Sequence, residues 1–457
     1  MGSELSADII DALADVPSVT DLRAGRAQAR ENAQRAFAAL LEPDEPGTFT
    51  QAERYAVAAF TALLHDEQRA VVFYLELLSD ETDEIHAGMV AKLARAAAGR
   101  GPYGVYRESG LAGESEPGAW FDGEEAAAKV GGRLAAAFGL AHLLVLHPRD
   151  ARPGTWEPLA KAGWTTDEAV SLAQLIAFLA FQLRVVRGLR VLAGADDGGA
   201  DARDGGSAGD GASAGDAASA GDGASAVTRE RDAAGDADAA AGAASESDVE
   251  GSGDLPLTTY PDIHAPERFV SHALGWHAWL EPVAERELTE AQIDSLIKPE
   301  RARQPYFRLL ARDPEALRAR TLTDLDIFYN TDGGLGRAER EFAAAVTSRF
   351  NGCVYCASVH AGRTLAESTG REDDVERLLA EGPGAEAGSA AWNAVRDAAV
   401  ALSSTPARFD AAHVRALEEA GLDKASVLDV INAVAFFNWA NRLMLGLGEP
   451  EVPRRFR

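Results

Sequence analysis

Apolar residues recur at helical spacing along most of this 457-residue chain. They return every three or four positions within stretches rich in Ala, Leu, Glu and Arg, which is typical of an α-helix with one buried face. Strand-like alternation of apolar and polar residues is scarce. The pattern therefore predicts an all-α fold. The clearest helical segments are Ala52–Leu64, Glu125–Leu146, Asp167–Leu192, Arg337–Phe350, Trp392–Leu402 and Asp423–Leu445.

Polar residues mark where several of these helices begin. The run Thr165–Glu168 and the single residue Asp423 each precede an apolar helical pattern, and their side chains can accept hydrogen bonds from the free amides of a first turn. We interpret a shorter stretch, Phe269–Leu280, as a further amphipathic helix. It contains two tryptophans and two histidines, and we expect it to pack in the core, with the wall of a pocket as the alternative.

A low-complexity segment divides the chain. Large apolar residues nearly vanish between Leu192 and Leu255, and a Ser-Ala-Gly-Asp-Gly-Ala unit repeats with small variations from Ser207 to Ala226. Such a sequence buries too little surface to offset the entropy lost on ordering. We therefore predict a disordered, acidic, Gly/Ala/Ser-rich linker at residues 194–254, flanked by helical domains at 1–193 and 255–457. A ligand-binding acidic tail is the alternative for this segment.

Charge and composition exclude several classes of protein. The formal net charge is −28, which repels phosphate backbones and argues against a nucleic-acid partner. We find no apolar run of bilayer-spanning length and expect no membrane partner. The N-terminus lacks the basic and apolar regions of a signal peptide. The chain has only two cysteines, and two free thiols fit a reducing compartment. We therefore expect the protein to be cytoplasmic.

The two predicted domains resemble each other. The helical pattern that starts at Ala52 is repeated from Ala338, and the pattern that starts at Asp167 is repeated from Asp423. We interpret this as a duplicated domain, with chance similarity between Ala-rich helices as the alternative. Ala52 and Ala338 are 286 residues apart. This offset aligns the N-terminal copy with a cluster of reactive residues described next. The aligned pairs are Tyr55 with Glu341, Glu67 with Cys353, Ala70 with Cys356 and Tyr74 with His360. We therefore expect the N-terminal copy to lack thiol chemistry and to shape or cover the active copy.

Both cysteines of the chain lie in one Cys-x-x-Cys motif. Cys353 and Cys356 are followed by His360 and preceded by Glu341. Because helical residues three, four and seven positions apart share a face, the two thiols and the imidazole can meet. A helix break at Asn351–Gly352 would place the thiols at a helix N-terminus, which favours thiolate. We expect burial to raise the pKa of Glu341 and to suit it to proton transfer.

Redox chemistry is the leading interpretation of this cluster, and two alternatives stay open. A Cys-x-x-Cys motif is also half of a structural zinc site, although the chain has no second cysteine pair. Buried cysteines also pack as small apolar residues. The joint spacing of thiols, imidazole and carboxylate favours a dithiol that closes into a disulfide and reopens. No metal site and no bound cofactor is predicted.

The segment Ala338–His360 resembles the alkyl hydroperoxidase D / carboxymuconolactone decarboxylase superfamily, especially its peroxidase-related branch. The resemblance is carried by a Glu, a Cys-x-x-Cys twelve residues on and a His four residues after the second Cys. It covers most of residues 255–457, and residues 1–193 resemble a degenerate, cysteine-less carboxymuconolactone decarboxylase-type domain. Members of the superfamily are all-helical and usually oligomeric, so the resemblance implies two duplicated helical domains in a homo-oligomer.

The resemblance also implies a role for each motif residue. Cys356 would attack the O–O bond of an organic hydroperoxide or hydrogen peroxide, and Cys353 would then form a redox-active disulfide with it. Glu341 and His360 would relay protons, and a partner dithiol such as a lipoyl-bearing protein would reduce the disulfide. Tyr355 stands where the family often has His, which puts the efficiency of the relay in question. The rival functions are a lactone decarboxylase or isomerase and a non-enzymatic dithiol redox switch.

Overall fold

The computed structural model describes residues 8–195, 247–249, 255–330 and 332–457. The predicted linker at 194–254 lies outside the described residues, apart from 194–195 and 247–249. The described residues are mostly α-helical, which confirms the predicted all-α fold. The helices before residue 195 are α1 Ile9–Ala14, α2 Pro17–Arg23, α3 Ala27–Leu41, α4 Gln51–His65, α5 Gln68–Glu81, α6 Glu84–Ala97, α7 Gly123–Val130, α8 Gly132–Leu146, α9 Glu157–Lys161 and α10 Thr166–Leu192.

The part of the chain after residue 255 is also helical and adds short strands. Its helices are α11 Glu290–Ser295, α12 Pro305–Leu310, α13 Pro314–Tyr329, α14 Arg337–Asn351, α15 Val354–Glu367, α16 Glu372–Glu381, α17 Ala390–Ser403, α18 Ala411–Glu419 and α19 Lys424–Leu447. Two antiparallel strand pairs accompany the helices of the described residues. They are β1 Ser247–Val249 with β2 Leu257–Thr259 and β3 Gly275–Ala278 with β4 Gly448–Glu451.

Five of the six predicted helical segments are confirmed within one or two residues, and the sixth is wrong as a single helix. The segment Glu125–Leu146 is split at Gly131, whose φ of 84° is left-handed and ends α7 before α8 begins. The predicted caps are confirmed. Thr165 accepts from the amide of Glu168 in a capping box, and Asp423 accepts from the amide of Ser426 at 2.8 Å.

The predicted helix at Phe269–Leu280 is wrong. Its residues include strand β3, which pairs in register with β4 at the end of α19, so that Trp276 lies opposite Pro450. Trp276 and Ala278 are buried while Gly275 and His277 are half-buried, which is the period-two alternation of a strand. The strand partner lies some 170 residues away in the chain, so local periodicity could not identify it.

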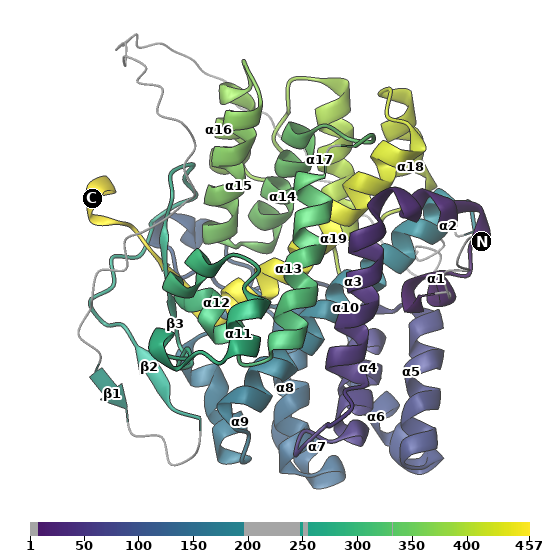
Figure 1. Ribbon diagram of the computed structural model, residues 1–457, viewed down its shortest axis with the longest axis vertical. Coiled ribbons are helices and arrows are strands. Elements are labelled where there is room, and N and C mark those ends of the chain that lie inside the picture. The colour runs from purple at the N-terminus through teal and green to yellow at the C-terminus, as the bar shows by residue number, and fades with distance from the viewer. Residues whose placement is uncertain (1–7, 196–246, 250–254, 331) are drawn as a thin grey trace, which may run out of the picture.

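The two parts of the chain share one hydrophobic core. Helix α10 packs against α19 and α3 packs against α13, so each pair joins a helix from before the linker to one from after it. Figure 1 shows α4 to α9 in its lower half, α14 to α18 in its upper half, and α3 beside α13 where the two groups meet. One buried apolar cluster includes residues from both parts, with Ile10 as its first member and Leu447 as its last. The predicted domain bounds stay a prediction, but the two parts are not separate bodies.

Helix α10 corrects one sequence expectation. By length and composition Thr166–Leu192 is apolar enough to cross a membrane, whereas we predicted no such run. In the structure, 94% of its most apolar window is buried inside the protein. Because its apolar surface is already covered by neighbouring helices such as α19 and α4, α10 resembles the central helix of a globular core.

Helix bounds support the internal repeat. Helices α4 and α5 span Gln51–His65 and Gln68–Glu81, while α14 and α15 span Arg337–Asn351 and Val354–Glu367. Each bound in the second pair lies 286 residues after its counterpart in the first, which is the offset found in the sequence. In each pair the two helices pack against each other, and the first helix of the pair packs against a long helix, α4 against α10 and α14 against α19. Whether the N-terminal half belongs to the same family stays a prediction.

A buried carboxylate near the start of α19, that of Asp429, ties the two parts together. Asp429 accepts hydrogen bonds from Arg26 at 2.9 and 2.8 Å, from the amide of Leu335 at 2.9 Å, and forms an ion pair with Arg340 at 3.2 Å. All three charged side chains are nearly inaccessible to water. Because its partners satisfy the carboxylate on both oxygens, the charge is tolerated in the core.

Candidate functional site

The turn between α14 and α15 positions the two thiols. Gly352 ends α14 with a left-handed φ of 82°, and a Cβ atom there would lie 2.4 Å from the side chain of Arg149. Only glycine suits both conditions. The helix break predicted at Asn351–Gly352 is therefore confirmed. The amide of Cys353 donates to the carbonyl of Ser348 at 2.8 Å, and Cys353 becomes the N-cap residue of α15.

Both cysteines are free thiols and both are buried, but they differ in access. Cys356 lies in the first turn of α15 and lines a cavity of about 230 Å³, whereas Cys353 is not among the residues that line the cavity. Burial raises the pKa of the Cys353 thiol well above its usual range, and a hydrogen bond to Cys356 raises it further. The expectation that the helix N-terminus makes Cys353 a ready thiolate is therefore wrong. Cys356 is the sulfur that a molecule in the cavity can reach.

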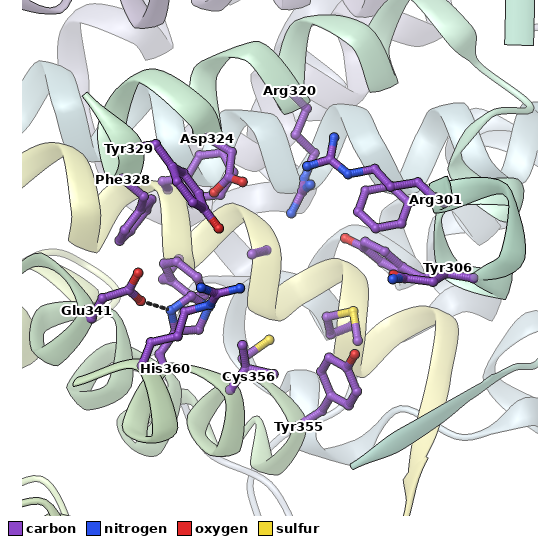
Figure 2. Close-up of a pocket in the computed structure, with 18 of the residues that line it drawn as sticks. Arg301, Tyr306, Arg320, Asp324, Phe328, Tyr329, Glu341, Tyr355, Cys356 and His360 are labelled. Atoms are coloured by element: carbon purple, nitrogen blue, oxygen red, sulfur yellow. Dashed lines mark hydrogen bonds and ion pairs between the residues drawn. The ribbon is translucent and has the colours of Figure 1, made fainter. Parts of the chain in front are cut away.

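Glu341, His360 and Arg337 form a connected group beside Cys356. The Nδ1 atom of His360 lies 2.5 Å from Oε2 of Glu341, and Nε of Arg337 donates to Oε1 of the same carboxylate at 2.7 Å. Glu341 is fully buried and belongs to α14, one helix away from His360 on α15. Figure 2 shows the Glu341–His360 contact at one side of the cavity, next to Cys356.

The expectation of a raised pKa for Glu341 is wrong. Burial acts in that direction, but His360 and then Arg337 outweigh it, and the net pKa of Glu341 is lowered. Glu341 is therefore a carboxylate at neutral pH. As an acceptor it binds the Nδ1–H tautomer of His360, which leaves Nε2 as the nitrogen free to exchange a proton with the cavity.

The ring of His360 is held in this orientation by aromatic neighbours. The ring of Phe437 packs edge-on at 4.1 Å between centroids, and Phe328 lies at 5.9 Å. Tyr355, the residue just before Cys356, lines the same cavity. Burial raises the pKa of Tyr355 to about 12, with the Cys356 and Cys353 sulfurs adding to the effect, so its phenol stays protonated and able to donate.

Thus the structure brings all five predicted residues to one place. Four of them line the cavity, and the fifth, Cys353, is hydrogen-bonded to Cys356. The wall on the opposite side comes from α12 and α13 and was not predicted from the sequence. A signal was present, since Arg320 falls on the same helical stripe as Ala316, Leu317 and Ile327, and an arginine on an apolar stripe needs an explanation. The missed lining residues include Tyr306, Arg320, Asp324, Phe328 and Tyr329.

The N-terminal counterparts of the reactive residues form no such group. Tyr74, aligned with His360, is fully buried and its hydroxyl donates to Gln182 at 2.5 Å. A second cavity, about 730 Å³, lies elsewhere in that half and is lined by His147 and Asp150 among apolar residues. Both ring nitrogens of His147 are already occupied, by Asp150 and by His142, each at 3.0 Å. The second cavity therefore offers no free imidazole nitrogen.

Comparison with known proteins gives one positive result. Residues 314–401 match the sequence model of the carboxymuconolactone decarboxylase family, and no curated protein and no solved structure matches the chain. Within the described residues, no group of three or more His, Cys, Asp and Glu side chains is placed to hold a metal ion. The matched segment runs from α13 through most of α17 and includes Arg320, Glu341, both cysteines and His360. Residues 314–401 are therefore similar to the carboxymuconolactone decarboxylase family, and the predicted reactive residues lie within this matched segment.

Proposed function

We propose that the protein is a thiol-dependent hydroperoxide reductase that uses Cys356 and Cys353 as a redox pair. The observation that supports this most is the cavity at which a buried thiol, an oriented imidazole and a protonated phenol meet. A carboxymuconolactone decarboxylase family domain is compatible with this activity but does not specify it.

In the first step, the Cys356 thiol gives its proton to Nε2 of His360, and the resulting imidazolium is stabilised by the Glu341 carboxylate. The thiolate attacks the terminal oxygen of R–O–OH. An S–O bond forms, the O–O bond breaks, and the sulfur is oxidised to sulfenic acid as the peroxide is reduced. The departing alkoxide takes the proton back from His360 and leaves as an alcohol, with Tyr355 placed to donate a hydrogen bond to it.

In the second step, Cys353 attacks the sulfenic sulfur. The S–S bond forms as the S–O bond breaks, and the hydroxyl leaves as water with the proton of the Cys353 thiol. The high pKa of Cys353 suits this order, because a thiol that is protonated at rest leaves Cys356 to react first. A partner dithiol, for which a lipoyl group is the proposed source, then reduces the disulfide and returns both protons. We expect no bound cofactor to take part, and we propose that the protein works in the cytoplasm as a homo-oligomer.

Counting thiols tests this proposal. One equivalent of cumene hydroperoxide should remove both free thiols from the parent protein. Cys356→Ser should keep its remaining thiol, while Cys353→Ser should accumulate a sulfenic acid that dimedone traps. Steady peroxide consumption with dihydrolipoamide should follow in the parent alone. Disulfide formation without turnover would instead indicate a redox switch, and an unreactive Cys356 would refute the proposal.

The family match favours one alternative, a decarboxylase or isomerase of a lactone. In that reaction His360 and Glu341 would act as acid and base and the thiols would not turn over. The double variant Cys353→Ser/Cys356→Ser separates the two functions, because it should keep any lactone activity and lose all peroxide reduction.

A further inference from the structure

Arg320 is an exception among the buried arginines of this protein. Nine arginines in the described residues are buried, and eight of them donate to a carboxylate or to backbone carbonyls. Arg320 is 6% exposed, and within the described part of the chain it makes no hydrogen bond or ion pair. Its guanidinium instead lies over the rings of Phe436 at 5.1 Å, Tyr306 at 5.7 Å and Trp439 at 5.9 Å.

An unpaired buried charge is costly, so its persistence needs a reason. Aromatic faces stabilise a guanidinium only in part. Arg320 lines the cavity that contains Cys356, and the buried hydroxyl of Tyr306, on the same wall, also has no hydrogen-bond partner among the residues that the structure describes. Figure 2 places Arg320, Tyr306 and Arg301 on one side of the cavity and Cys356 and His360 on the other. Two donors without acceptors therefore face the space that a substrate would enter.

The charges around the cavity point to an anion. Five cationic side chains and three carboxylates line it, although the chain as a whole carries a net charge of −28. Glu341 is engaged by Arg337 and His360. Asp324, one turn along α13 from Arg320, forms no ion pair with it, and burial raises the pKa of Asp324 against the opposing effect of Arg320. Among the described residues, therefore, no carboxylate forms an ion pair with Arg320.

We infer that this cavity binds a small organic substrate through a carboxylate group, held by Arg320 and Tyr306, while the reactive end of the substrate lies at Cys356. The planar guanidinium matches a carboxylate in a two-point hydrogen bond. The cavity is larger than the roughly 150 Å³ that accommodates benzene, and Phe328, Phe436 and Phe437 offer apolar walls for the carbon skeleton. This inference rests on the proposed function for the identity of the reactive end, a hydroperoxide.

A matched pair of substrates tests the inference. Cumene hydroperoxide and its 4-carboxylate differ by one charged group, and kcat/KM is measured for both with dihydrolipoamide as reductant. The parent should prefer the carboxylate by roughly 10- to 100-fold, the range expected from charge-assisted hydrogen bonds. Arg320→Gln should abolish the preference by raising the KM for the carboxylate substrate. Arg320→Lys should keep part of it.

Arg318→Gln is the control, since Arg318 lies on the same helix but pairs with Asp294 at the surface. A binding measurement separates this inference from the proposed function. The unreactive 4-isopropylbenzoate should bind the parent, as measured by calorimetry, and neutral cumene should not. Binding without peroxide turnover would refute the reductase and support the carboxylate site. Turnover without a preference for the carboxylate substrate, or equal binding of both probes, would overturn the carboxylate site. Both measurements use the parent protein, so they do not depend on the folding of a variant.

Discussion

Replacing Glu341 by Gln tests how the buried carboxylate controls His360. Gln has the same shape but one carbonyl oxygen, so it cannot accept from both Arg337 and Nδ1 of His360, as Glu341 does. Its amide can also donate to Nδ1 and thereby stabilise the tautomer whose Nε2 carries the proton. That tautomer cannot take the proton of Cys356. Glu341→Gln should therefore slow the reaction of Cys356 rather than unfold the protein.

The expected loss follows from the interactions removed. A hydrogen bond to a charged group contributes about 1.5–3 kcal/mol, and the carboxylate also stabilises the imidazolium formed when Cys356 ionises. We expect a total loss of about 2–4 kcal/mol in the barrier, which is roughly 30- to 1000-fold in rate. The assay is the rate of sulfenic acid formation in single-turnover experiments with Cys353→Ser as the background. This background isolates the first step.

Glu339→Gln is the matched control for this prediction. Glu339 lies on the same helix and accepts from the indole of Trp392 at 3.3 Å, a bond that a Gln carbonyl can keep. We expect its rate to equal that of the parent, and circular dichroism should show that both variants fold. A folded Glu341→Gln that reacts as fast as Glu339→Gln would refute the proposed control of His360 by the carboxylate.

Three further predictions concern stability. Burial, together with the neighbouring His147, lowers the pKa of His142 from 6.5 to about 4. Because the unfolded chain binds the proton more tightly, acidification from pH 6.5 to 4 should remove about 3 kcal/mol of unfolding free energy. Urea titrations should show a smaller loss in His142→Gln. Gly188→Ala would place a methyl group 2.4 Å from the Ile431 side chain of α19 and should lower the free energy of unfolding by about 1–3 kcal/mol. Gly139→Ala, whose nearest neighbour would lie at 3.7 Å, should be neutral or stabilising by up to about 1 kcal/mol. Equal melting temperatures of the two variants would contradict this prediction. Asp429→Ala leaves the buried Arg26 without its carboxylate and should cost about 3–5 kcal/mol in chemical denaturation, so a loss below about 1 kcal/mol would show that the pair is dispensable.

The two thiols differ in their access to the cavity, and this difference bears on which of them would react first. Cys356 lines the cavity and Cys353 does not, so under the proposed function a peroxide in the cavity would meet Cys356. Burial raises the pKa of the Cys353 thiol and keeps it protonated while Cys356 is still a thiol. Under the proposed function, Cys356 would therefore be oxidised first and Cys353 would close the disulfide.

Most of the helical architecture was predictable from local pattern. Apolar spacing identified α4, α10, α14, α17 and α19, because a helix that buries one face must repeat apolar residues at its own period. The reactive motif was predictable for the same reason, since Cys356 and His360 are four residues apart on one helix and their proximity depends only on helix geometry. The positions of the glycine break and of the N-terminal caps followed from backbone chemistry that is also local.

What the sequence by itself could not determine depends on contacts between distant segments. Strand β3 was misread because its partner β4 lies beyond α19. The pKa of Glu341 was predicted in the wrong direction because burial alone was considered, and only the fold brings His360 and Arg337 to that carboxylate. Likewise, only the packed structure shows that Arg320 has no hydrogen-bond acceptor among the described residues. Period and spacing are properties of a single segment, whereas charge balance and strand pairing belong to the packed molecule, and for this reason only the tertiary structure decided them.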